Sequence, residues 1–128
     1  MLVAIITGLA SLAVAGFPDD PDQYSEWMQQ SCRMQQVGHA GGVPENHTAF
    51  CSCLDGEIRS AASSAVYRIF ALGSQGSLQD RAMVEDWAAA RDTAAVEAAA
   101  LSPEERAQFQ PILQTALGTC LPQSYQGE

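Results

Sequence analysis

The stretch AFCSCLDGEI, residues 49–58, decides the fold because it places two cysteines within an amphipathic helix. At about 100° per residue, Phe50, Leu54 and Ile58 fall on one side of that helix. Cys51 and Cys53 flank this apolar stripe from opposite edges, about 160° apart. Side chains that diverge this far cannot form a disulfide with each other, since the bridge needs β-carbons within about 4 Å. Three polar residues of the same helix are predicted to point away from the core: Ser52, Asp55 and Arg59.

The chain has four cysteines, Cys32, Cys51, Cys53 and Cys120, and we expect them to form two disulfides. The geometry of the helix excludes the pairing of Cys51 with Cys53, and with it the pairing of Cys32 with Cys120. Two arrangements stay open, namely 32–51 with 53–120 or 32–53 with 51–120. In either one, the helix around residues 49–58 is joined to an earlier helix by one bridge and to the last helix by the other.

Start and stop signals divide the first half of the chain into two helices. Asp20 followed by Pro21 predicts a helix that runs to residue 37 and stops at Gly38. A Gly-rich loop over residues 38–47 follows, and Asn46 or Thr48 is predicted to cap the helix that contains the cysteine pair. That helix should reach about residue 63, where the next segment either continues it or begins a new helix capped by Ser63 or Ser64.

In the second half, the sequence GSQGS over residues 73–77 predicts a turn, and a long Ala-rich helix should cover residues 78–100. Ser102 and Pro103 begin the final helix, and Pro111 should kink or split it at Gln110. The final helix has an apolar stripe formed by Phe109, Ile112, Leu113, Ala116, Leu117 and Cys120. No segment alternates like a strand. We therefore predict an all-α fold, with four to five short helices in an irregular disulfide-stapled bundle.

The N-terminal segment predicts export. Residues 1–15 carry no charged side chain and end in Ala13-Val14-Ala15, a pattern typical of a secretory signal peptide. We expect this signal to be cleaved and residues 16–128 to form a single helical domain, located in the periplasm or secreted. An uncleaved anchor and a segment that packs into the fold are the alternatives. The basic residues are all arginine, which is typical of a GC-rich genome and favours a bacterial periplasm.

Charge and motifs narrow the classes of function. The 128-residue chain has a net charge of −9, which argues against nucleic-acid binding and against a polybasic membrane contact. The nucleophile elbow, the H-E-x-x-H zinc motif, the P-loop and the dinucleotide fingerprint are all absent, so we expect no enzyme and assign no cofactor. His39 and His47 lie in or beside the Gly-rich loop, which is therefore a possible binding loop.

The sequence predicts a non-enzymatic exported module that binds or inhibits another molecule, with a protein of unknown identity as its partner. One alternative is a soft-metal (copper) or thiol-handling protein that uses Cys51 and Cys53 with nearby Met and His side chains, although no ligand set has a fixed metal spacing. The other alternative is a carrier of a small apolar ligand. A carrier predicts an internal cavity lined by four aromatic residues: Trp27, Phe70, Trp87 and Phe109.

Overall fold

A computed structural model describes residues 16–127 of the chain. The described part is all-α, as predicted, and contains no strand. Its helices are α2 (Pro21–Ala40), α3 (Thr48–Ala61), α4 (Ser64–Leu78), α5 (Trp87–Ala100), α6 (Pro103–Arg106) and α7 (Phe109–Cys120), with 3-10 turns η1 (Pro44–His47), η2 (Gln79–Arg81) and η3 (Leu121–Gln123). No helix within residues 16–127 is long and apolar enough to cross a membrane. The predicted signal segment lies outside the described residues.

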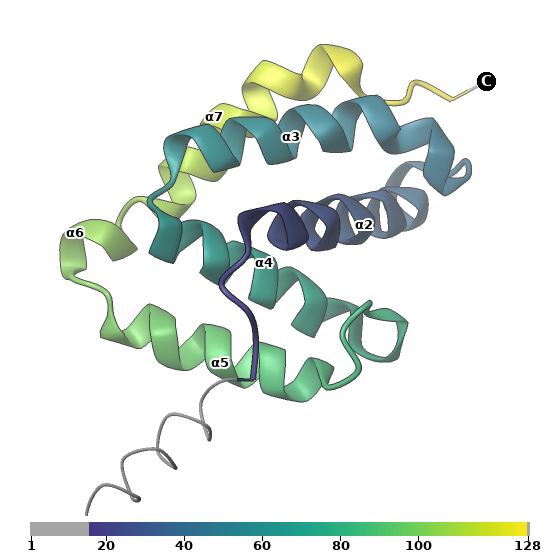
Figure 1. The fold of residues 1–128 in the computed structure, drawn as a ribbon. Coiled ribbons are helices and arrows are strands. Elements are labelled where there is room, and N and C mark those ends of the chain that lie inside the picture. Colours follow the sequence, from purple (N-terminus) through teal and green to yellow (C-terminus); the bar gives the residue numbers. More distant parts are fainter. Residues whose placement is uncertain (1–15, 128) are drawn as a thin grey trace, which may run out of the picture.

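The helices pack as a chain of neighbours. Helix α5 lies against α4, α4 lies against α2, and α3 contacts both α2 and α7 (Figure 1). Short α6 links α5 to α7 at one end of the bundle (Figure 1). Because α7 packs against α3 and makes few contacts with α2 or α4, its remaining sides stay uncovered. The main core lies between α2, α3, α4 and α5. A second, smaller buried cluster consists of Phe50, Cys51 and Cys120.

Three helices begin at the predicted caps Asp20, Ser63 and Ser102. The Asp20 carboxylate accepts hydrogen bonds from the backbone N–H groups of Asp22 and Gln23, and the Ser102 hydroxyl accepts one from Glu105 N–H. Ser63 caps α4, so α3 and α4 are separate helices. The prediction that Asn46 or Thr48 caps α3 is wrong, because the N-cap residue is His47, which makes no side-chain cap hydrogen bond, and the Asn46 side chain accepts from Val43 N–H instead. Helix α2 passes through its predicted stop at Gly38 and ends at Ala40, and its C-cap is Gly41, whose φ of 81° suits glycine.

The structure corrects the prediction for residues 73–86. The segment 73–77, predicted as a turn, is helical and belongs to α4, whereas the chain leaves the helix over residues 82–86. Gly76 sits where α4 meets α5, and a β-carbon there would lie 2.6 Å from the β-carbon of Arg91. This glycine therefore serves close helix packing and not a turn.

Buried Gln75 accounts for the loop at 82–86. Its side-chain oxygen accepts hydrogen bonds from the N–H groups of Met83 and Val84, at 2.6 and 3.2 Å. Its amide nitrogen donates to the Trp27 carbonyl and to the Gln30 side chain on α2. These bonds satisfy backbone groups that lie outside any helix, so the loop can pack against the bundle. The predicted helix over 78–100 is therefore shortened to α5.

The break before α7 lies two residues earlier than predicted. Residues 107 and 108 separate α6 from α7, and Pro111 is the third residue of α7. In the first turn of a helix the backbone N–H has no intrahelical partner, so the missing N–H of a proline costs little there. Pro111 therefore lies within a continuous helix and does not split it.

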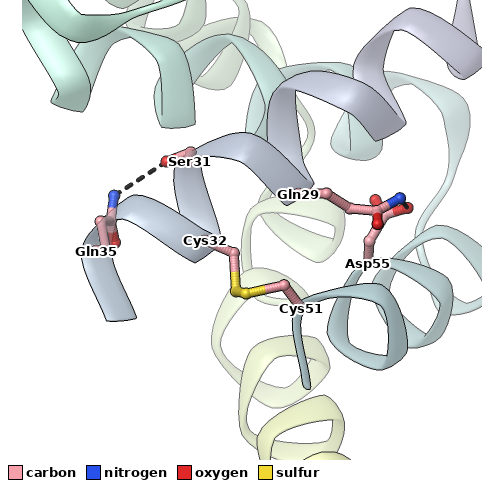
Figure 2. The surroundings of a disulfide bond; sticks show 6 residues. All are labelled: Gln29, Ser31, Cys32, Gln35, Cys51 and Asp55. Carbon is pink, nitrogen blue, oxygen red and sulfur yellow. Dashed lines mark hydrogen bonds between the residues drawn. A yellow bond between two sulfur atoms is a disulfide. The ribbon is translucent and has the colours of Figure 1, made fainter. Parts of the chain in front are cut away.

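Asp55 is buried, contrary to the prediction that it points away from the core. The Tyr67 hydroxyl donates to Oδ1 at 2.6 Å, and the Ser25 hydroxyl donates to Oδ2 at 2.5 Å. The Gln29 amide also reaches Oδ2, at 3.5 Å (Figure 2). Helix α3 touches α2 as well as α7, so its buried arc is wider than a single apolar stripe. Asp55 lies on the part of that arc that faces α2 and α4.

Burial and the hydrogen bond to Asp55 both raise the pKa of Tyr67 above its ordinary value. In the unfolded chain this phenol ionises near pH 10, so above about pH 10 the unfolded state releases a proton that the native state keeps. We expect the stabilisation to be complete below pH 10 and to be lost as the pH rises toward the native pKa. Urea unfolding between pH 8 and pH 11 measures this loss.

Tyr67→Phe removes the ionising group, so the variant should lose much less stability over this alkaline interval than the unmodified chain. Burial also raises the pKa of Tyr24, although Arg68 beside it opposes that rise. Tyr24 should therefore account for part of the alkaline loss that remains. Identical pH profiles for the unmodified chain and Tyr67→Phe would contradict the assignment.

Candidate functional site

Both disulfides connect α3 to other helices. Cys32 of α2 is bonded to Cys51 (Figure 2), and Cys53 is bonded to Cys120 of α7, with Cα–Cα distances of 5.6 and 5.7 Å. Two disulfides were predicted, and the structure selects one of the two arrangements left open. All four cysteines are oxidised. The hypothesis of soft-metal or thiol chemistry at Cys51 and Cys53 needs thiolates, so this structure does not support it.

The two histidines of the predicted binding loop lie in different environments. His39 is exposed in the last turn of α2, whereas His47 is completely buried. His47 Nε2 lies 2.8 Å from the Gly41 carbonyl oxygen and therefore donates to it, while Nδ1 has no hydrogen-bond partner. The His47 and Tyr125 rings meet in an edge-to-face arrangement, with centroids 5.2 Å apart. His47 thus holds the loop and the C-terminal tail together and is not accessible to a ligand.

No group of three or more His, Cys, Asp or Glu side chains within residues 16–127 is arranged to hold a metal ion. An open apolar groove of about 460 Å³ lies between α2, α3, α4 and α7. Its lining consists of Met28, Ser31, Cys32, Gln35, Gln36, Phe50, Leu54, Ile58, Ile69, Phe70, Gly73, Ser74, Phe109, Leu113 and Leu117. None of these side chains carries a charge.

The apolar stripe predicted on α3 contributes to this groove. Phe50 and Ile58 are buried beneath it, and Leu54 between them is half-buried. The disulfides flank the stripe on either side and hold α2 and α7 beside α3. The same residues that were expected to bury α3 in a core therefore also line an open surface.

The groove exists because α7 packs chiefly against α3 and only its first turns reach α4, where Phe109 meets Phe70. Ala116 and Cys120 of α7 are buried, but Leu113 and Leu117 keep 37% and 40% of their surface exposed. The sequence predicted one continuous core stripe on α7, and the structure divides it between the α3 contact and the groove. On the α4 side of the groove, Gly73 leaves space, since a β-carbon at this position would meet nothing within 4 Å.

Two of the polar lining residues, Ser31 and Gln35, are held by hydrogen bonds. The Ser31 hydroxyl donates to the Ser74 carbonyl at 3.2 Å, and the Gln35 amide donates to the Ser31 hydroxyl at 3.1 Å (Figure 2). Gln35 also bonds to the Ser77 hydroxyl, so these side chains join α2 to α4. What remains free in the groove is largely hydrocarbon and aromatic surface, which suits an apolar occupant.

The aromatic residues expected in a carrier cavity are dispersed. Phe70 and Phe109 line the groove, and their ring centroids are 5.0 Å apart. Trp27 belongs to the main core, and Trp87 lies at the start of α5, where the Arg91 guanidinium covers its ring. Sequence reasoning found the two apolar stripes on either side of the groove but treated both as core. The signal available was the absence of charge from α7, which leaves its outer side without the charged residues of an ordinary exposed face.

Comparison of the chain with known proteins finds no match. No protein-family model matches the chain, and neither a curated protein nor a solved structure matches it.

Proposed function

We propose that this chain is an exported, non-enzymatic binding module whose groove takes the apolar side of a helix from a partner protein. The open, uncharged groove bounded by four helices carries this proposal. Two disulfides on either side of α3 support a location in the periplasm or outside the cell, because such bonds persist in oxidising compartments. The apolar segment over residues 1–15 is consistent with the same route.

The dimensions of the groove favour a helical occupant. Its α7 wall runs from Phe109 to Leu117, a length of about 12 Å at 1.5 Å per residue. A helix of two to three turns covers this length and presents apolar side chains at i, i+4 and i+7. Its opposite side would stay in solvent, as the open groove requires.

A small apolar ligand is the second candidate. The groove volume of about 460 Å³ lies within the range of small-molecule sites, about 300–1,000 Å³. Such sites, however, enclose most of the surface of their ligand, and this groove is open to solvent. The four aromatic residues named for a carrier do not line one site, because Phe70 and Phe109 line the groove whereas Trp27 lines a different pocket, so a helix fits better.

Gly73→Leu tests the groove directly, because the new side chain would fill space that is now empty. Gly56→Leu is the matched control, since Gly56 is an exposed helical glycine on α3 that does not line the groove. Both changes raise helix propensity by a similar amount, so a difference between them reports on the groove.

The probe is a fluorescent synthetic Ala/Lys helix with leucines at i, i+4 and i+7, measured by anisotropy against the same peptide with serines in place of leucines. We expect the leucine peptide to bind, Gly73→Leu to weaken its binding about tenfold or more, and Gly56→Leu to leave it unchanged. Equal binding of the leucine and serine peptides, or equal effects of the two variants, would overturn the proposal. Binding of palmitate in the absence of any binding of the leucine peptide would replace it with the second candidate.

A further inference from the structure

The last part of the chain is unusual in having no charge. Residues 107–127 contain no Asp, Glu, Arg or Lys, although the whole chain has a net charge of −9. Three exposed leucines lie in this segment at four-residue intervals: Leu113, Leu117 and Leu121, with 37%, 40% and 63% of their surface exposed. Side chains four residues apart on a helix lie one above the other, so the leucines form a row. We call this row the leucine ridge.

The leucine ridge continues the wall of the groove. Leu113 and Leu117 belong to the groove lining, and Leu121 follows in η3, one turn beyond it. The opposite wall is provided by α2 residues without charge, among them Met28 and Gln36. The described surface therefore carries an apolar projection directly beside an apolar depression, both neutral.

We propose that two copies of this chain associate through this surface, with the leucine ridge of each copy seated in the groove of the other. A two-fold contact requires a surface that is complementary to itself, and a ridge beside a groove meets this requirement. The proposal rests on the proposed function, because it assigns an occupant to the same groove when no partner helix is present.

The absence of charge from this surface removes a local barrier to contact between two copies. Two chains with a net charge of −9 repel each other, and like charges brought into contact in an interface oppose binding. The uncharged ridge and groove allow two copies to meet without burying carboxylates. Added salt should strengthen this association, because it screens the repulsion between the remaining acidic surfaces.

Self-association would regulate access to the groove. A partner helix and a second copy compete for the same apolar lining, so the apparent affinity for the partner falls as the concentration of the chain rises. The dimer would also cover leucines that otherwise remain in contact with water.

The experiment is sedimentation velocity of the oxidised chain at micromolar and submillimolar concentration, in low and in high salt. We expect the mass to approach that of two copies as concentration and salt increase. Leu121→Glu places a charge on the ridge and should raise the dimer dissociation constant about tenfold or more. Val96→Glu is the matched control, because Val96 is an exposed apolar residue on α5, at 69% exposure, away from the ridge.

A mass of one copy under all these conditions would overturn the proposal, and so would a dimer that responds equally to Leu121→Glu and Val96→Glu. Peptide binding separates this failure from failure of the proposed function. Leu121 does not line the groove, so Leu121→Glu should bind the leucine peptide like the unmodified chain at low protein concentration and more tightly at high concentration. If the chain stays monomeric and Gly73→Leu still weakens peptide binding, the dimer proposal fails and the proposed function stands, with a different protein as the partner.

Discussion

Replacing Cys53 and Cys120 together by alanine is expected to lower the free energy of unfolding by about 4 kcal/mol. The disulfide closes a loop with a sequence separation of 67 residues, so its removal returns much conformational entropy to the unfolded chain. Replacing Cys32 and Cys51 in the same way should cost less, about 3 kcal/mol, because their separation is 19 residues. Urea unfolding of the two double variants measures both values.

The two double variants should also differ in where the structure loosens. Helix α7 packs chiefly against α3, and Cys53–Cys120 is the covalent link between these helices. We expect hydrogen exchange in α7 to accelerate much more without this bond than without Cys32–Cys51. Binding of the leucine peptide should fall as well, since α7 forms one wall of the groove. Equal stability losses and equal exchange in α7 would show that α7 is held by packing alone.

The second large effect is expected from Asp55→Ala, which should lower the free energy of unfolding by about 3 kcal/mol. The substitution removes the acceptor for the Tyr67 and Ser25 hydroxyls and leaves both donors without a partner in a buried site. It also removes a connection between α2, α3 and α4, because these three residues come from the three helices.

Asp92→Ala is the matched control for Asp55→Ala. The side chain of Asp92 is 70% exposed and pairs with Arg91, so its loss should change stability by about 0.5 kcal/mol or less. Asp55→Asn retains one acceptor oxygen and should fall between the two alanine variants. If Asp55→Ala and Asp92→Ala unfold at the same urea concentration, the Asp55 network does not stabilise the fold.

Local signals were enough to predict three helix starts. At Asp20 and Ser102 the side chain bonds to backbone N–H groups two or three residues ahead, so the whole interaction is present in a short stretch of sequence. Glycines were less informative. Gly73 and Gly76 predicted a turn, but the structure uses Gly76 for contact between α4 and α5, which no local pattern reveals.

The predicted position of Asp55 failed for a related reason. An apolar stripe predicts one buried side of a helix, and α3 is covered by α2 on one flank and by α7 on the other. A helix with neighbours on two flanks buries polar side chains at the edges of its stripe when a partner such as Tyr67 is available. The number of neighbours is a property of the packed bundle.

From the residues alone it followed that the chain is helical and that Cys51 and Cys53 bond to separate partners, since both conclusions depend on spacings within a few helical turns. Only the packing of the helices decided that Cys51 bonds to Cys32 and Cys53 to Cys120. It also decided that α7 packs against α3 and leaves a groove open. The physical reason is the separation along the sequence of the residues that interact. Periodicity and capping act within one helix, whereas the choice of flank and the open groove depend on contacts between residues far apart in the sequence.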